Sequence, residues 1–362
     1  MRKSNNPLDI ITGIRYYLLG KSIDHIYTPS PKTFYVEEIV DLESLGFTQE
    51  KSNYMVLLMT KRDLETLKAI EIISQALRIP LSNIYYLGLK DKHATTTQYI
   101  FIKTNILRKE VPQKLCNDRI LLQHIGYTKR KPSRKSLQGN RFRILISGKN
   151  VVNELEDMLS DIITYGLPNY YGYQRFGIRR PNSHILGKFI MLKRYDLFIK
   201  ELLSSIYSYE DKDEILLRCS KILPGKRFLY ESMFNSILKL FKNNIRRKRM
   251  TTFLVEAYLS YLFNELLNTL IESCGWDCLK KQYPIASCED AYEYYGDIID
   301  TENIPYNMLD RLGCWRRSGI MIPENVLIYR SNSDTVLEFT LGVGEYASII
   351  LREIFKNKYR LY

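Results

Sequence analysis

A carboxylate between two ammonium groups, at Lys90-Asp91-Lys92, is the part of this chain whose residue types are best suited to chemistry. Apolar runs lie on both sides of it, at residues 84–87 and 99–102. This pattern predicts a strand, a polar loop and a second strand, with Gly88 allowing the backbone to turn before the triplet. Three threonines and a glutamine, at residues 95–98, then offer hydroxyl and amide groups.

The charges around Asp91 predict what this loop does. The two flanking lysines favour the ionised form of the carboxylate, and their positive charge attracts an anionic substrate. An ionised carboxylate in such a loop can act as a nucleophile or as a base. The alternative is a solvated, charged turn between two strands, without any catalytic role.

The loop also resembles a known motif. Gly88-Leu89-Lys90-Asp91-Lys92-His93-Ala94-Thr95, followed by Gln98, is similar to the signature loop of the TruD family of tRNA pseudouridine synthases. In that family the aspartate of the Lys-Asp-Lys triplet is the catalytic residue. The resemblance therefore implies that Asp91 is catalytic. The charges of Lys90 and Lys92 make these two lysines candidate substrate-binding residues.

A second motif, Gly139-Asn140-Arg141-Phe142, resembles the Gly-Asn-x-Phe motif of the same family, whose asparagine and phenylalanine line the active site. It leads into a predicted strand in which Phe142, Ile144 and Ile146 share one face. The resemblance implies that the Phe142 ring stacks on a flipped uracil and that the Asn140 amide fixes the base edge or a nearby loop. From the residues alone, Phe142 is better explained as part of the core, and it is the family match that favours the pocket.

A third motif, at residues 168–177, reads Pro-Asn-Tyr-Tyr-Gly-Tyr-Gln-Arg-Phe-Gly. Its glycines and aromatic residues predict a tightly packed loop in which Gln174 and Arg175 are available for polar contacts. The string resembles the family's Pro-Asn-Tyr-Phe-Gly-x-Gln-Arg-Phe-Gly signature, which marks the beginning of an insertion domain. On this basis Arg175 is a candidate substrate-binding residue.

Other stretches resemble the family with departures. The predicted strand at residues 34–40 is similar to the family's N-terminal strand, but Thr28 stands where a lysine is common. Residues 230–235 resemble a family helix in which Glu231 replaces a glutamine. Residues 337–348 predict a strand, a glycine turn and the start of a helix, and they resemble the family's C-terminal segment with Gly342 in place of a proline.

The net charge is +13 and the pI is about 9.2, which favours a polyanionic partner, with nucleic acid ahead of a membrane surface. Residues 127–149 hold many basic residues and no acidic one. The predicted RNA-binding residues within this window are Lys129, Arg130, Lys131, Arg134 and Lys135. A charged surface loop explains the window without RNA. A second basic block, at residues 239–249, is explained equally well by RNA contact and by a solvated helix end.

The remaining sequence predicts helices around these motifs. Residues 62–79 form an amphipathic pattern that ends at Pro80, and this helix is expected to brace the sheet behind the Asp91 loop. Asn150 is a predicted cap for a helix at 151–165, which Gly166 ends. Beyond residue 177 the chain reads as mostly helical up to about residue 330, and residues 274–330 carry no motif to which a role can be assigned.

A chain of 362 residues is long for one core and suggests two domains. No apolar run reaches transmembrane length and the first residues lack a signal-peptide core, so we expect a cytoplasmic protein that does not enter a membrane. The six cysteines form no Cys-x-x-Cys pair and are expected to be reduced. A zinc site at Cys274, Cys278, Cys288 and Cys314 is the alternative, but its spacing matches no standard pattern.

The resemblance implies an α+β fold. Residues 1–165 and 331–362 would form a catalytic domain on a mainly antiparallel sheet, interrupted by a mostly helical insertion domain at 166–330. The implied reaction is the isomerisation of uridine to pseudouridine in tRNA, at uridine 13 of the D-stem, without a metal or an organic cofactor. The sequence leaves the exact nucleotide, the rate and the oligomeric state open.

Two other functions fit parts of the sequence. The departures at Thr28, Glu231 and Gly342 are compatible with an inactive relative that binds RNA. An aspartate among basic residues also fits a small-molecule enzyme such as a phosphosugar isomerase, which would show no salt-dependent affinity for RNA.

Overall fold

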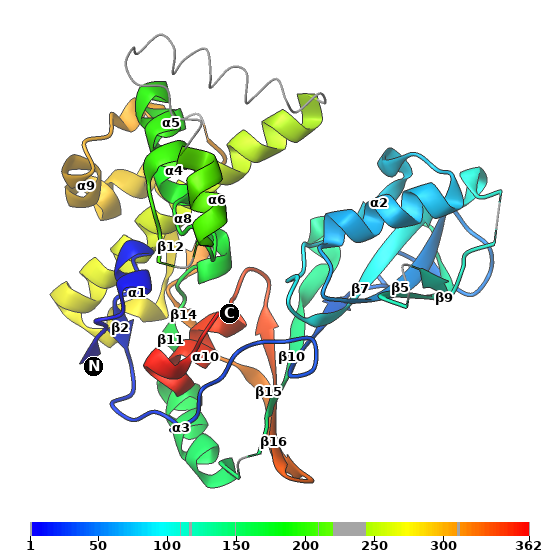
Figure 1. Cartoon of the computed structure of the whole chain (residues 1–362), viewed down its shortest axis with the longest axis horizontal. Coiled ribbons are helices and arrows are strands. Elements are labelled where there is room, and N and C mark those ends of the chain that lie inside the picture. The colour runs from blue at the N-terminus through cyan, green and yellow to red at the C-terminus, as the bar shows by residue number, and fades with distance from the viewer. Residues whose placement is uncertain are drawn as a thin grey trace. The chain divides into compact units, whose positions relative to one another are not determined.

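The structure, a computed structural model, describes residues 2–361 apart from residues 109, 116–117, 149, 209, 220–243 and 310–311. The chain forms two compact units, each built from separate stretches of sequence (Figure 1). The helical unit comprises Met1–Gly20, Leu167–Met321 and Ser348–Glu353, and the sheet unit comprises Lys21–Gly166, Ile322–Ala347 and Ile354–Tyr362. The division into a catalytic domain and an insertion domain at residues 166 and 330 rests on family resemblance and stays a prediction.

One large sheet forms the centre of the sheet unit. Its strands follow the order β15-β16-β10-β3-β7-β5-β9-β4, and β6 and β8 pair with β7 and β9. The strands are β3 (Phe34–Val40), β4 (Phe47–Thr48), β5 (Tyr54–Arg62), β6 (Ile84–Tyr86), β7 (Thr95–Lys103), β8 (Lys114–Leu115), β9 (Ile120–Thr128), β10 (Leu137–Ile146), β15 (Glu324–Ser331) and β16 (Asp334–Gly342). Among these strands β3 and β7 form the parallel pair and the other pairs are antiparallel. The predicted α+β class with a mainly antiparallel sheet is confirmed.

Helix α2 (Thr66–Leu77) lies along one face of β7, β5 and β9 (Figure 1). Its buried side chains Ile70, Ile73 and Leu77 belong to the same apolar cluster as inward-facing side chains of these strands. Each such side chain contributes about 1.5–3 kcal/mol on burial, so the helix braces the sheet as predicted. It begins at Thr66 rather than at residue 62, because β5 continues to Arg62 and Asp63 takes a left-handed conformation with φ 44°.

Helix α3 (Val152–Tyr165) follows β10 in the sheet unit. It ends as predicted at Gly166, whose φ of 68° is readily adopted by glycine. The prediction that Asn150 caps its first turn is wrong. The helix begins one residue later than expected, and Val151 occupies the capping position. No side chain of the described residues caps the helix there.

The helical unit is built mainly from α1 (Pro7–Ile11), α4 (Ser183–Met191), α5 (Tyr195–Ser204), α6 (Lys212–Cys219), α8 (Asn244–Cys274) and α9 (Tyr292–Thr301). Short strand pairs accompany them, formed by β1 (Arg2–Lys3) with β2 (Tyr16–Tyr17), β11 (Leu167–Pro168) with β14 (Ile320–Met321), and β12 (Gln282–Pro284) with β13 (Arg316–Ser318). Helices α4 and α8 approach closely at Gly187, where a Cβ atom would lie 1.9 Å from the Leu254 carbonyl oxygen. The predicted loop at residues 167–177 is tightly packed, with Tyr170 and Phe176 fully buried. After β16 the chain forms α10 (Ala347–Phe355), as the C-terminal pattern predicts.

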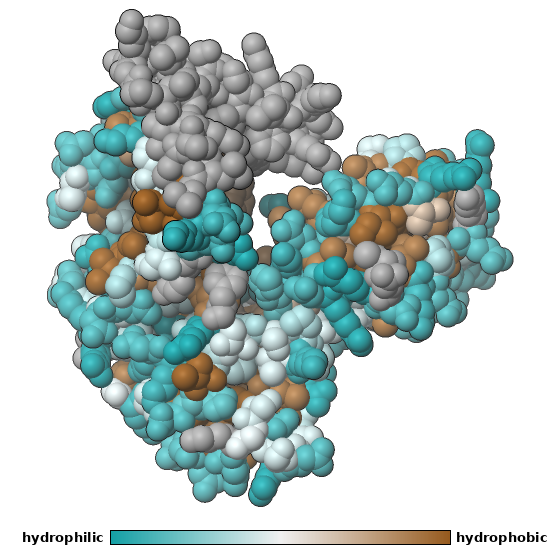
Figure 2. Space-filling view, in the orientation of Figure 1, coloured by the Kyte–Doolittle hydropathy of each residue, from teal (hydrophilic) through white to brown (hydrophobic). Residues whose placement is uncertain are grey.

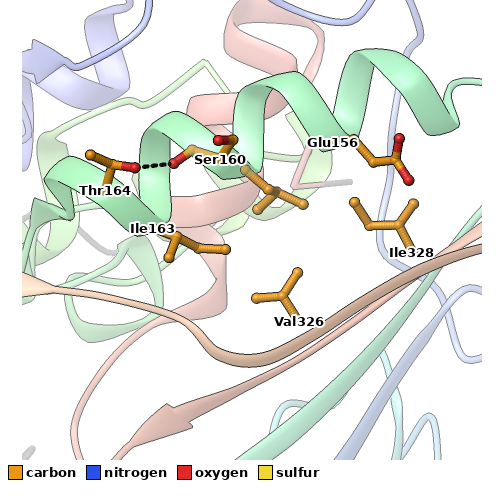
Figure 3. Close-up of a pocket in the computed structure, with 7 residues that line it drawn as sticks. Glu156, Ser160, Ile163, Thr164, Val326 and Ile328 are labelled. Atoms are coloured by element: carbon orange, nitrogen blue, oxygen red, sulfur yellow. Dashed lines mark hydrogen bonds between the residues drawn. The ribbon is translucent and has the colours of Figure 1, made fainter.

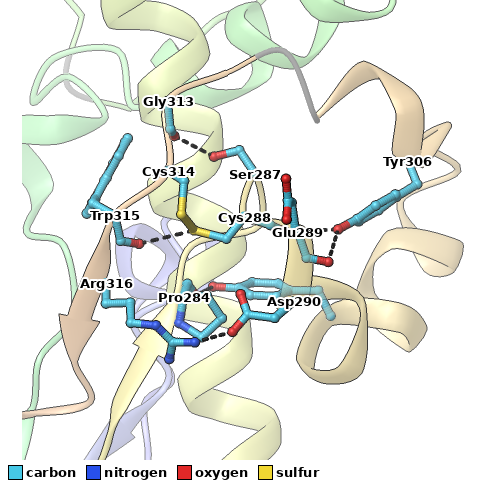
Figure 4. Close-up of a disulfide and its surroundings, with 11 residues drawn as sticks. Pro284, Ser287, Cys288, Glu289, Asp290, Tyr306, Gly313, Cys314, Trp315 and Arg316 are labelled. Atoms are coloured by element: carbon cyan, nitrogen blue, oxygen red, sulfur yellow. Dashed lines mark hydrogen bonds and ion pairs between the residues drawn. A yellow bond between two sulfur atoms is a disulfide. The ribbon is translucent and has the colours of Figure 1, made fainter.

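The prediction of reduced cysteines is wrong for four residues. Cys274 is bonded to Cys278. Cys288 is bonded to Cys314, and Figure 4 shows this second disulfide. In the second disulfide, the Cys288 sulfur lies 3.5 Å from the Trp315 carbonyl oxygen. These four are also the cysteines of the alternative zinc site, and pairing as disulfides removes the thiolates such a site would use.

Some predicted features lie outside the described residues, namely the stretch at 230–235 with Glu231 and the part of the second basic block before α8. The rest of that block lies in the first turns of α8. Among the helices that the structure describes, none is both long and apolar enough to cross a membrane.

Candidate active site

Asp91 lies in the loop between β6 and β7, as the sequence predicts. Its side chain is half-buried. Within the part of the chain that the structure describes, the Asp91 carboxylate makes no hydrogen bond and no ion pair. The main chain of the loop, in contrast, is hydrogen-bonded at successive positions.

The first main-chain contacts come from β7 and from the start of α2. The Gln98 amide donates to the Gly88 carbonyl oxygen at 3.2 Å. The Thr66 hydroxyl accepts from the Lys90 backbone N–H at 3.0 Å and donates to Gln98 Oε1 at 3.0 Å. Thr66 is the first residue of α2, so the helix that braces the sheet also fixes the loop.

Glu38 of β3 holds the side chain of Lys90. Lys90 Nζ lies 2.7 Å from Glu38 Oε1, and Glu38 Oε2 accepts from the Tyr99 backbone N–H at 3.1 Å. Both side chains are buried. Lys92 is exposed, so the two lysines of the triplet have different environments. Their predicted contacts with substrate stay predictions, and Lys90 would have to leave Glu38 to make one.

Lys61, at the end of β5, was not singled out from the sequence. Its Nζ donates to the Asp91 carbonyl oxygen at 2.8 Å and lies 3.4 Å from the Lys90 carbonyl oxygen. The residue is fully buried. A signal for it exists in the sequence, because Leu57, Met59 and Lys61 occupy the inward positions of one strand and a lysine is the least expected of the three.

The register of the strands places Lys61 in a row with the second motif. Lys61 pairs with Thr96, Thr96 with Val36, Val36 with Phe142, and Phe142 with Phe339. Directly paired residues project from the same face of a sheet, so this row crosses from the Asp91 loop to the Phe142 strand on one face.

The Phe142 ring packs among aromatic neighbours in this row. Its centroid lies 5.4 Å from that of Phe339 and 6.0 Å from that of Phe34. The side chain is 6% exposed, so most of the ring belongs to the core. Stacking on a base stays a prediction, and it would use the remaining edge or a movement of these rings.

Asn140 lies in the next row, opposite Glu38 and Leu341. Its Oδ1 atom is buried and has no hydrogen-bond partner in the described part of the chain, and the same holds for Thr96 Oγ1. Leaving a buried polar atom unpaired costs about 1–3 kcal/mol. Two such atoms on the face that carries Lys61 mark a position where a ligand can supply the missing partners.

The electrostatics of Asp91 differ from the expectation based on its flanking lysines. Burial raises the pKa of Asp91, and the charges of Lys61, Lys90 and His93 lower it without cancelling the effect of burial. Burial lowers the pKa of Lys61 to about 8, and the nearby Asp91 charge opposes that shift. A carboxyl group with a raised pKa exchanges protons more readily near neutral pH than an ordinary aspartate.

The other predicted binding residues fall in two places. Lys129, Arg130, Lys131, Arg134 and Lys135 are all exposed in the sheet unit. Hydrophilic side chains cover much of the visible surface (Figure 2). Arg175 belongs to the helical unit, where its guanidinium pairs with Glu256 at 2.9 Å and donates to Ser260 at 3.1 Å.

A shallow pocket in the sheet unit lies apart from these residues. It is located between α3 and β15 and is lined by Glu156, Leu159, Ser160, Ile163, Thr164, Val326 and Ile328 (Figure 3). None of the predicted site residues lines it. Its one titratable group is Glu156, so the pocket lacks a second acid or base that could work with Glu156 in catalysis.

Comparison with known proteins agrees with the motifs. Residues 12–280 match the family model for tRNA pseudouridine synthase D (TruD). The chain is 27% identical to tRNA pseudouridine synthase D of Aquifex aeolicus, over 90% of this chain and 96% of the relative. It is 30% identical to a probable tRNA pseudouridine synthase D of Sulfurisphaera tokodaii, over 86% of this chain and 88% of the relative.

The fold agrees as well. A crystal structure of a Methanosarcina mazei protein that carries the TruD name superposes with a TM-score of 0.64, at 20% identity, over 97% of this chain and 98% of that one. The family match covers most of the sequence, including the Asp91 loop and the motifs at residues 139–142 and 168–177. The chain therefore belongs to the TruD family of tRNA pseudouridine synthases.

Proposed function

We propose that this chain converts uridine to pseudouridine in tRNA, with Asp91 as the catalytic residue. The observation that carries the proposal is a contrast within one loop. Its main chain is hydrogen-bonded by Gln98, Thr66 and Lys61, whereas the Asp91 carboxylate has no partner among the described residues. A fixed backbone that presents an unengaged carboxylate is suited to act on a bound substrate.

In the proposed reaction Asp91 acts as nucleophile or base toward the ribosyl-uracil. The bond between ribose C1′ and uracil N1 breaks, the uracil turns, C5 bonds to C1′, and the C5 proton moves to N1. Substrate and product are isomers, so the sequence of steps requires no oxidant or reductant. The detached uracil has to stay in the site until the new bond forms, which favours a closed pocket.

Asn140 and Phe142 are the residues proposed to hold the base. The target nucleotide has to leave the tRNA stack to reach Asp91. The unpaired Asn140 Oδ1 is an acceptor and matches the N3–H donor of uracil. Phe142 offers an aromatic edge in the neighbouring row of the same sheet face.

The proposal assigns RNA phosphate contacts to Lys129, Arg130, Lys131, Arg134 and Lys135, which are exposed cations in one window. Lys92 and Arg175 are assigned to substrate binding on the basis of their family motifs. In the same proposal, residues 166–330 form the insertion domain, the target is uridine 13 in the D-stem, and the enzyme works in the cytoplasm on tRNA.

The test is pseudouridine mapping on a set of unmodified tRNA transcripts incubated with the wild-type protein. A new pseudouridine at position 13 is the expected result, and a single site elsewhere would correct the target only. RNA binding without any pseudouridine would favour the RNA-binding relative. Affinity that does not fall steeply with salt would contradict tRNA as the partner.

A further inference from the structure

We propose that Lys61 is the positioning residue of Asp91, holding the backbone of the catalytic loop and placing a positive charge near its carboxylate. The inference rests on the proposed function of Asp91 and adds a residue that no motif of the sequence marked. It concerns a lysine that the fold buries in the sheet, in a position where an apolar side chain would continue the strand pattern.

The contacts of Lys61 are directed to the main chain of the loop. Its Nζ reaches the Asp91 carbonyl oxygen at 2.8 Å and the Lys90 carbonyl oxygen at 3.4 Å. Because one ammonium holds these two consecutive carbonyls, it fixes the peptide planes on both sides of Asp91. Those planes determine the direction in which the Asp91 side chain leaves the backbone.

The burial of Lys61 argues against a purely structural role. The residue is fully buried, and it forms no ion pair with any carboxylate of the described residues. A buried ammonium without such a partner is costly. Residues that break a local pattern at such a cost are concentrated at functional sites.

Three charged groups from two segments face this lysine. Asp91 and Lys90 belong to the loop, and Glu65 precedes α2; the charges of Asp91 and Glu65 raise the pKa of Lys61, while that of Lys90 lowers it. Burial outweighs them, so the pKa of Lys61 falls to about 8. Lys61 therefore carries its charge at neutral pH and loses it in the mildly alkaline range.

Asp91 faces further groups besides Lys61. The charges of Lys90 and His93 lower the pKa of Asp91, as the charge of Lys61 does. From the C-terminal segment, the buried phenol of Tyr359 interacts with the Asp91 charge, which contributes to raising the pKa of Tyr359. Burial raises the pKa of Asp91 and the Lys61 charge opposes that effect. Removing the charge should therefore raise the Asp91 pKa further.

The experiment measures single-turnover pseudouridine formation between pH 5.5 and 9.5 under saturating enzyme, for the wild type, Lys61→Met and Lys61→Arg. Lys68→Met serves as the control, since Lys68 is an exposed lysine on the neighbouring helix. Lys61→Met should fold, bind tRNA about as tightly as the wild type, and lose about 100-fold or more in rate. In its pH–rate profile, the fall in rate on the acidic side should move to higher pH. Lys61→Arg should keep the positive charge, so its profile should lack the fall in rate that the wild type shows near pH 8.

A rate within twofold of wild type and an unchanged acidic side of the profile in Lys61→Met would overturn the inference. If Lys61→Met fails to fold, Lys61→Arg decides, because an unchanged fall in rate near pH 8 in that variant contradicts a charge effect of Lys61. A separate readout needs no turnover: the carboxyl ¹³C shift of Asp91, assigned with Asp91→Asn, should titrate at higher pH in Lys61→Met. An inactive wild type would therefore refute the proposed function, while this titration still tests the link between the two residues.

Discussion

The Lys90 ammonium lies 2.7 Å from the Glu38 carboxylate, and both side chains are buried in the sheet unit. The first lysine of the Lys-Asp-Lys triplet therefore points into the protein and ties the loop to β3. Its neighbour Asp91 has a carboxylate that no described residue binds by a hydrogen bond or an ion pair. In this arrangement the pair between Glu38 and Lys90 is part of what positions the candidate catalytic residue.

Replacing Glu38 by glutamine should destabilise the protein. Glu38→Gln keeps the shape but leaves the buried Lys90 ammonium without its counter-charge, a change that costs about 3–5 kcal/mol. Urea unfolding should show this loss as a lower midpoint. Glu37→Gln is the matched control, because Glu37 is the exposed neighbour on the same strand and should change stability by less than about 0.5 kcal/mol. Equal stability of both variants would contradict a structural role for the pair.

Replacing Thr66 by valine should loosen the loop. The Thr66 hydroxyl bridges the Lys90 N–H and Gln98, and valine leaves that N–H unpaired at a cost of about 1–3 kcal/mol. Hydrogen exchange at the Lys90 amide should accelerate, and pseudouridine formation should slow. Thr60→Val removes a hydroxyl that bonds only to Thr97 in the described contacts, and should leave the Lys90 amide protected. Unchanged protection in Thr66→Val would contradict this role.

Replacing Phe142 by leucine should separate catalysis from packing. Leucine keeps much of the apolar volume between Phe34 and Phe339 but removes the aromatic face, so activity should fall about 10- to 100-fold, the equivalent of one stacked base. Phe101→Leu is a control of the same chemistry at another buried strand position. It should show a similar loss of stability, measured by thermal unfolding, with activity retained. Full activity in Phe142→Leu would contradict stacking on the base and would show that Phe142 serves only in the core.

The stability of the helical unit should fall at mildly acidic pH because of His184. This residue is buried against Phe176 and Tyr261, and burial lowers its pKa to about 3. The unfolded chain takes up a proton below its ordinary pKa of about 6.5 while the folded chain does not. The stabilisation is thus complete above pH 6.5 and is lost as the pH falls toward 3.

Between pH 7 and pH 5 this difference amounts to roughly 2 kcal/mol of unfolding free energy. Urea unfolding at the two pH values measures it. In His184→Phe the pH dependence should become shallower by that amount, whereas His124→Gln, at an exposed position, should leave it unchanged. A slope in His184→Phe equal to that of the wild type would show that His184 does not cause the effect.

Much of the site could be predicted because its motifs are continuous in sequence. The Asp91 loop, β6, β7 and the strand that carries Phe142 lie where the apolar patterns place them. The partners of the loop were not predictable in the same way. Glu38, Lys61 and Thr66 lie 52, 30 and 24 residues from the loop atoms they bind. Such contacts depend on the strand register and on the docking of α2, which local patterns do not specify.

Two local predictions, the Asn150 cap and the reduced cysteines, were wrong. Asn150 is a good capping residue, but the chain between β10 and α3 places Val151 at the capping position. The cysteine prediction used spacing in the sequence, whereas Cys288 and Cys314 are brought together across 26 residues by the fold. In both cases the position of a residue in space, and not its type, decided the outcome.

The most direct test of the account compares wild-type protein with Asp91→Asn on a single tRNA transcript. Asparagine matches the shape of aspartate and removes only the charge and the nucleophilic oxygen, so the fold and the tRNA affinity should be retained. Pseudouridine should form with the wild type and be absent with Asp91→Asn at the longest reaction time. Pseudouridine formation at the wild-type rate by Asp91→Asn would contradict the central claim that the Asp91 carboxylate performs the chemistry.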